Sequence, residues 1–132
     1  MATRKTPIYT IGYSGRTADD IKRIVGGGLL LDIRFSPRSR KAGFSQKKLE
    51  ENFNDQYQWL YEFGNENFRG NTILLYDPAA GLEIIKTLSE KYHDMPLFLM
   101  CACANPTTCH RATVATLLRK HGYEVTEYKD PT

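Results

Sequence analysis

Three thiols, an imidazole and a guanidinium are concentrated in one short segment near the end of the 132-residue chain. The cysteines lie between Cys101 and Cys109, and the segment ends in Cys109-His110-Arg111. A thiolate is both a nucleophile and a metal ligand, and a helix N-terminus or a neighbouring cation lowers its pKa. Because a helix is expected to begin close to Cys109, this residue is the candidate nucleophile. The alternative is that Cys109 is a small buried residue with a packing role only.

His110 follows Cys109 directly, which bears on whether the two side chains can act as a pair. Neighbouring residues of a helix point roughly 100° apart and do not face each other, so a Cys109–His110 dyad is not expected. His110 is instead expected to reach a group on another strand-end loop or to hydrogen-bond locally. Cys101, Cys103, Cys109 and His110 form a conceivable Cys3His metal set. C-x-C spacing is atypical of structural zinc sites, so we expect no metal at this set. We also expect no other cofactor.

A second group that could do chemistry is the basic segment that begins at Arg34. It also contains Arg38, Arg40 and Lys41, and it has no acidic side chain. Guanidinium groups bind phosphate and carboxylate through parallel N–H donors, so this segment predicts a site for a small anionic ligand. The alternative is a solvated loop.

One arginine could also be purely structural. In that case its guanidinium would be paired with Asp32 or Glu66 rather than with a ligand.

The hydrophobic pattern predicts the elements that must position these groups. Apolar or alternating runs indicate strands at 8–12, 29–34, 57–61, 97–101 and 123–128, and the segment 72–76 is ambiguous. Capping residues followed by 3.6-residue periodicity indicate helices after Thr17, after Ser45, after Asp77 and near Cys109. The alternation predicts a single three-layer α/β domain, with a mainly parallel sheet of four or five strands and helices on both faces.

Ligands of open parallel sheets bind beside the carboxyl ends of the strands. Three polar segments leave such ends here: Gly12-Tyr13-Ser14-Gly15, the basic segment, and 101–111. The first of them could add backbone N–H groups to an anion site.

These segments resemble the family known as domain of unknown function 488. The resemblance rests on Thr10-Ile11-Gly12-Tyr13-Ser14, Asp32-Ile33-Arg34, Pro37-Arg38-Ser39-Arg40, Gly43-Phe44, Cys101-Ala102, Pro106 and Cys109-His110-Arg111. It implies an α/β fold with a motif-rich face at the strand ends, and it implies no established reaction. The chain departs from the family at Cys103, where a glutamate is common.

Composition and charge set broad limits. The net charge of +3 is too small to indicate nucleic-acid binding by itself, and the longest apolar run is too short to cross a bilayer. Three clustered cysteines suit a reducing compartment, so we expect a cytoplasmic protein without a secretory signal. We expect one domain over residues 1–132, flexible at 1–6, and we predict no oligomeric state.

The leading hypothesis is an enzyme that acts on a phosphorylated, nucleotide or otherwise anionic substrate. The candidate catalytic residues are Asp32, Arg34, Cys109 and Arg111. The candidate ligand-binding residues are Gly12, Tyr13, Ser14, Arg38, Arg40, Cys101 and His110. This hypothesis fails if Arg34 and Arg111 lie on opposite faces of the sheet.

The alternative is a binding module for a nucleotide, a nucleic acid or a partner protein, with structural cysteines. Steep weakening of ligand binding by salt, together with tolerance of Cys109→Ala, would favour it.

Overall fold

Five short strands form one all-parallel sheet in the computed structural model, which describes residues 6–67, 70, 72–92, 94–103 and 109–130. The strands are β1 (Ile8–Gly12), β2 (Leu29–Asp32), β3 (Tyr57–Trp59), β4 (Leu97–Cys101) and β5 (Val125–Glu127). Their order across the sheet is β3-β2-β4-β1-β5, so β4 is central and the last strand lies at an edge. The predicted fold class is confirmed.

In the described part of the chain, four α-helices connect the strands, and side-chain caps determine where three of them begin. The helices are α1 (Ala18–Val25), α2 (Gln46–Phe53), α3 (Pro78–Lys91) and α4 (His110–Lys120). Thr17 and Asp20 form the expected capping box of α1, while Ser45 and Asp77 cap α2 and α3. These side chains accept hydrogen bonds from N–H groups that lack a partner in the first turn.

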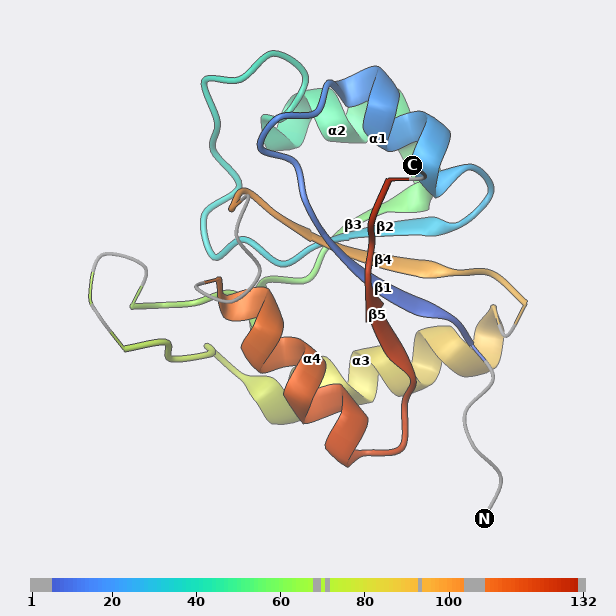
Figure 1. Cartoon of the computed structure of the whole chain (residues 1–132), viewed down its shortest axis with the longest axis vertical. Coiled ribbons are helices and arrows are strands. Elements are labelled where there is room, and N and C mark those ends of the chain that lie inside the picture. The colour runs from blue at the N-terminus through green and yellow to red at the C-terminus, as the bar shows by residue number, and fades with distance from the viewer. Residues whose placement is uncertain (1–5, 68–69, 71, 93, 104–108, 131–132) are drawn as a thin grey trace.

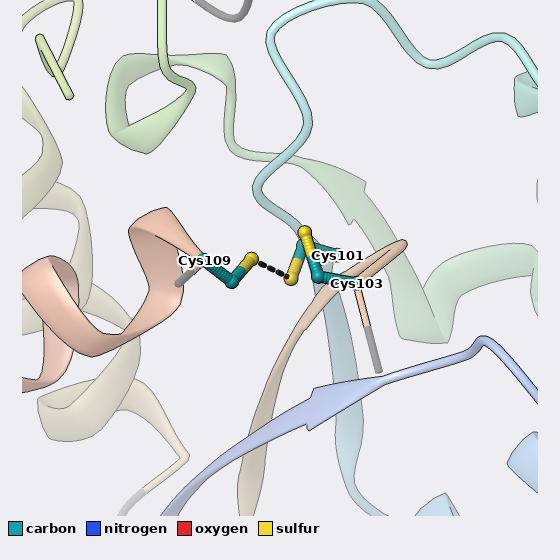
Figure 2. Close-up of side chains that lie close together, drawn as sticks. All are labelled: Cys101, Cys103 and Cys109. Carbon is teal, nitrogen blue, oxygen red and sulfur yellow. Dashed lines mark hydrogen bonds between the residues drawn. The ribbon is translucent and has the colours of Figure 1, made fainter. Parts of the chain in front are cut away.

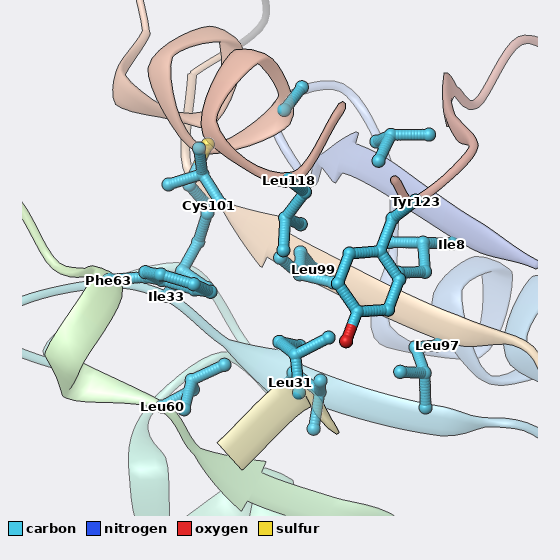
Figure 3. Close-up of a cluster of buried hydrophobic side chains, with 14 of the residues drawn as sticks. Ile8, Leu31, Ile33, Leu60, Phe63, Leu97, Leu99, Cys101, Leu118 and Tyr123 are labelled. Atoms are coloured by element: carbon cyan, nitrogen blue, oxygen red, sulfur yellow. The ribbon is translucent and has the colours of Figure 1, made fainter. Parts of the chain in front are cut away.

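The helices cover both faces of the sheet (Figure 1), with α1 and α2 on one face and α3 and α4 on the other. Strand residues alternate between two apolar clusters because successive side chains point to opposite faces. Leu30 and Met100 belong to the cluster under α1 and α2. Leu31, Leu99 and Cys101 belong to the cluster under α3 and α4, part of which is drawn in Figure 3.

Three strands are shorter than expected. The strand predicted at 123–128 spans only Val125–Glu127. The strand predicted at 29–34 ends at Asp32, although the N–H of Ile33 still bonds to the carbonyl of Met100. The strand predicted at 57–61 ends at Trp59 because the chain turns into the 3-10 helix η2 (Tyr61–Phe63). In the ambiguous segment, Leu75 forms an isolated bridge.

Of the residues expected to be flexible, 1–5 lie outside the described residues. Thr6 is buried, and its hydroxyl donates to the carbonyl of Ser89. Within the described part of the chain, no helix has both the length and the apolar character needed to cross a membrane.

The connectivity creates a switch point at the carboxyl end of β4. Helices α1 and α2 follow β1 and β2 on one face, whereas α4 follows β4 on the other. Because β4 lies between β1 and β2, the segments leaving these strands diverge there. Such a divergence is where open α/β sheets bind ligands.

Candidate thiol site

All three cysteines meet at this switch point (Figure 2). Cys101 is the last residue of β4, and Cys109 is the N-cap of α4. Their Sγ atoms lie 2.8 Å apart, and the Sγ atoms of Cys101, Cys103 and Cys109 all lie within 4.8 Å of one another. Cys101 and Cys109 are 1% and 2% exposed, while Cys103 is exposed. The cluster therefore has two covered thiols and one that faces solvent.

His110 contacts Cys109, contrary to the expectation that the two would not face each other. Its Nδ1 lies 3.7 Å from the Sγ of Cys109. The helical rule fails here because Cys109, as N-cap, has the extended dihedral angles φ −101° and ψ 148°. The expectation that His110 would reach a group on another strand-end loop is confirmed. Its Nε2 lies 2.7 Å from the carbonyl oxygen of Ile33, just beyond β2.

The contact with Ile33 determines which ring nitrogen of His110 carries the proton in the neutral state. A carbonyl oxygen only accepts hydrogen bonds, so Nε2 must be the donor. In a neutral ring, Nδ1 is then unprotonated and is free to accept the proton of the Cys109 thiol. Burial by itself would lower the pKa of His110, but its hydrogen bonds with Cys109 and Ile33 outweigh this effect and raise the pKa.

The three thiols differ in how strongly they hold a proton. Hydrogen bonding from the Cys101 thiol is the largest cause that lowers the pKa of Cys109; burial opposes it, and His110 and the backbone N–H of Arg111 assist. Conversely, hydrogen bonding to Cys103 and Cys109, together with burial, raises the pKa of Cys101. Hydrogen bonding with Cys101 also lowers the pKa of Cys103. The arrangement thus favours the proton on Cys101 rather than on Cys109.

Arg111 supports the cluster from within α4 rather than facing a ligand. Its Nε and Nη2 bond to the two carboxylate oxygens of Glu127 at 2.9 and 3.0 Å. Its Nη1 donates to the Sγ of Cys101 at 3.2 Å and to the carbonyl of Cys103 at 2.6 Å. The side chain of Arg111 is 1% exposed, so it is a positioning residue.

The guanidinium of Arg34 is also held by hydrogen bonds within the protein, but it lies on the opposite face of the sheet. Its Nε and Nη2 form a two-point ion pair with Asp32, one of the two partners expected for a structural arginine. Its Nη1 donates to the Tyr13 hydroxyl and to the carbonyl of Phe44, both in the layer of α1 and α2. Because Arg111 belongs to α4, which covers the other face of the sheet, the two arginines do not converge. The anion site built on them is not formed, which corrects the leading hypothesis.

The first strand-end segment also differs from expectation. The N–H groups of Tyr13 and Ser14 donate to the carbonyls of Cys101 and Ala102, so they are not available to an anion. The Tyr13 ring is stacked on Phe44 and buried. Gly12 has a steric role, because a Cβ there would overlap the carbonyl oxygen of Cys103.

The remaining predicted site residues lie apart from these contacts or outside the described part. Arg38 and Arg40 are exposed on the segment after β2, and the Nζ of Lys41 donates to the carbonyl of Tyr13. Pro106, which carried part of the family resemblance, lies outside the described residues.

The metal set weighed from the sequence is brought together only in part. The three thiols have the spacing of a group that could hold a metal ion, and His110 is not a member of that group.

Residues 16–73 match the family described as Domain of unknown function DUF488. These residues, fewer than half of the chain, carry a DUF488 domain. The DUF488 match includes Asp32, Arg34 and the basic segment, and it ends before β4, so the thiol cluster lies outside it. Comparisons with curated proteins and with solved structures gave no match.

Sequence reasoning missed two contributors to the site. Glu127 holds Arg111, and the carbonyl of Ile33 orients His110. Cys103 supplies the exposed thiol, although the sequence pointed to it only as part of a metal set. The position of Glu127 at the end of the last predicted strand was a usable signal, because strand ends gather at one edge of a parallel sheet. No signal in the sequence indicated the role of the Ile33 carbonyl.

Proposed function

We propose that this DUF488 protein is a thiol-dependent enzyme in which the thiolate of Cys109 is the reactive group. The observation that carries the proposal is the position of the Cys109 sulfur, at the N-terminus of α4, 2.8 Å from the Cys101 sulfur and 3.7 Å from His110 Nδ1. Enzymes activate a thiol by an adjacent base and by a helix N-terminus, and both are present here.

In the proposed mechanism, His110 is the general base. The proton of Cys109 moves to Nδ1, while Nε2 stays hydrogen-bonded to Ile33 and stabilises the imidazolium. The Cys109 sulfur then donates an electron pair to an electrophilic centre, either of the substrate or of an adduct that the substrate forms with a neighbouring thiol, and the displaced group leaves with the bonding electrons and takes up a proton. Cys101 retains its proton and donates it as a hydrogen bond to the Cys109 thiolate.

The test measures thiolate directly, through its ultraviolet absorbance as a function of pH in the reduced protein. Wild type is expected to contain thiolate at neutral pH, and Cys109→Ser is expected to lose a large part of that absorbance. Serine is a preferred N-cap residue, so this variant should retain α4. If absorbance rises only near the ordinary thiol pKa, Cys109 is not activated and the proposal is wrong.

Peptide-mapped alkylation, with and without a chelator, complements the titration. Labelling at neutral pH without a chelator supports a free thiolate. Labelling that requires the chelator would mean that the cluster holds a metal ion, which would overturn the proposal. Salt-sensitive nucleotide binding that survives Cys109→Ser, with no activated thiol, would instead favour a binding module.

A further inference from the structure

The thiol that a substrate meets first is not the one with the general base. Cys109 is 2% exposed, whereas Cys103 is exposed to solvent, with its Sγ within 4.8 Å of both buried sulfurs. A single activated thiolate would suffice for attack on a carbonyl or alkyl carbon. A second and third sulfur within this range are useful for exchange at sulfur, where an incoming sulfur must be displaced by a neighbouring one.

The contacts hold Cys103 in this position. Its carbonyl accepts from Nη1 of Arg111 at 2.6 Å, and the same Nη1 donates to the Sγ of Cys101 at 3.2 Å. Gly12 leaves room for the Cys103 carbonyl beside β1. One guanidinium nitrogen therefore fixes the exposed thiol segment relative to the buried pair.

We propose that Cys103 is the attacking thiol and Cys109 the resolving thiol of a dithiol centre that reduces low-molecular-weight disulfides. This inference rests on the proposed function, because it needs Cys109 as a thiolate. It adds the substrate class and a second catalytic residue.

The reaction has two displacement steps. In the first, the Cys103 thiolate attacks one sulfur of the substrate disulfide, the substrate S–S bond breaks, and one substrate thiolate leaves and takes a proton. In the second, the Cys109 thiolate attacks the Cys103 sulfur, which forms a Cys103–Cys109 disulfide and releases the second substrate thiolate. The substrate gains two electrons, and the protein dithiol loses them. A dithiol reductant returns the protein to its starting state.

Cys101 is the member of the cluster that takes no part in the two proposed displacement steps. It lies under α4 at 1% exposure and donates to the Cys109 sulfur, which keeps Cys109 ionised for the second step. A Cys101–Cys109 disulfide is the competing product, since these two sulfurs lie 2.8 Å apart.

The experiment treats the reduced full chain with bis(2-hydroxyethyl) disulfide, quenches with acid, and identifies the products by mass and peptide mapping. Wild type is expected to give the Cys103–Cys109 disulfide. Cys109→Ser should accumulate a mixed disulfide on Cys103, because the second displacement is blocked. Cys103→Ser should slow oxidation on the order of tenfold or more, because access and thiolate fraction both limit attack.

The outcomes separate the two proposals. If Cys103→Ser forms a Cys101–Cys109 disulfide at the wild-type rate, Cys103 is not the attacking thiol and this inference fails, while the proposed function stands. A mixed disulfide of Cys109→Ser that maps to Cys101 would likewise show that Cys103 is not the attacking thiol. If wild type does not react and contains no neutral-pH thiolate, both proposals fail. Cys101→Ser is the matched control and should still form the Cys103–Cys109 disulfide, more slowly.

Discussion

The charge state of Cys109 depends on donors from three parts of the chain. The Cys101 thiol comes from β4, the His110 ring is held by the carbonyl that follows β2, and the N–H of Arg111 belongs to α4. Each donor favours the ionised sulfur, so removal of any one should raise the pKa of Cys109. The imidazole is the donor that can be removed with least effect on the core, because His110 is only partly buried.

We therefore predict that His110→Ala shifts the thiolate absorbance curve to higher pH by about one pKa unit. The direction follows because loss of the hydrogen bond destabilises the thiolate, so a smaller fraction is ionised at neutral pH. His121→Ala is the matched control, since His121 is exposed at the end of α4. Identical curves for the two variants would show that His110 does not act on Cys109.

Asp32 offers a second prediction at the scale of one residue. Asp32→Ala leaves the buried guanidinium of Arg34 without its counter-charge, and breaking such a pair costs about 3–5 kcal/mol. Tyr57→Phe removes only one hydrogen bond to the same carboxylate and should cost about 1.5 kcal/mol. Urea denaturation measures both losses in the free energy of unfolding. A smaller loss for Asp32→Ala than for Tyr57→Phe would contradict a structural role for the ion pair.

At the scale of elements, the site depends on how closely β1 approaches the segment that leaves β4. A Cβ at position 12 would overlap the Cys103 carbonyl and lie 2.8 Å from Nη1 of Arg111. The strand end and the guanidinium occupy that space together, so β1 has no room for a side chain there.

We expect Gly12→Ala to reduce the free energy of unfolding by about 1–3 kcal/mol, because the β4 segment must move to accept the methyl group. The displacement should also slow labelling of Cys103 at neutral pH. Gly27→Ala is the matched control, since a Cβ at Gly27 meets nothing within 4 Å. Equal stability of both variants, measured by urea denaturation, would mean that β1 does not pack against Cys103 as described.

At the scale of the whole molecule, the thiol site links the last strand to the centre of the sheet. Glu127 of the edge strand β5 accepts from Arg111 in α4 and from the hydroxyl of Thr10 in β1. Through Arg111, the edge strand is connected to both Cys101 and Cys103. Loss of this carboxylate should therefore affect global stability and the thiols together.

The prediction is that Glu127→Ala costs about 3–5 kcal/mol, because the Arg111 guanidinium is 1% exposed and loses its counter-charge. Hydrogen exchange should show faster opening of β5, and Cys103 should label more slowly at neutral pH. Glu124→Ala changes an exposed residue of the preceding turn and should leave both readouts unchanged. Unaltered labelling of Cys103 in Glu127→Ala would show that the edge strand does not influence the thiol site.

The sequence by itself determined the elements and the fold class. Caps such as Thr17 with Asp20 and the apolar runs of β1 and β4 act over a few residues, so their signals are legible in the chain. The same reasoning located the thiols at the end of β4 and the start of α4.

Only the tertiary structure decided which of these groups meet. Arg34 and Arg111 are both at strand ends, yet the alternation of β2 directs the ion pair of Arg34 to one face while α4 crosses the other. The bond between His110 and Ile33 joins residues 77 positions apart. The extended N-cap geometry of Cys109 brings its side chain into contact with that of His110, its neighbour in the sequence. Such contacts depend on crossover direction and packing, which no local pattern of residues specifies.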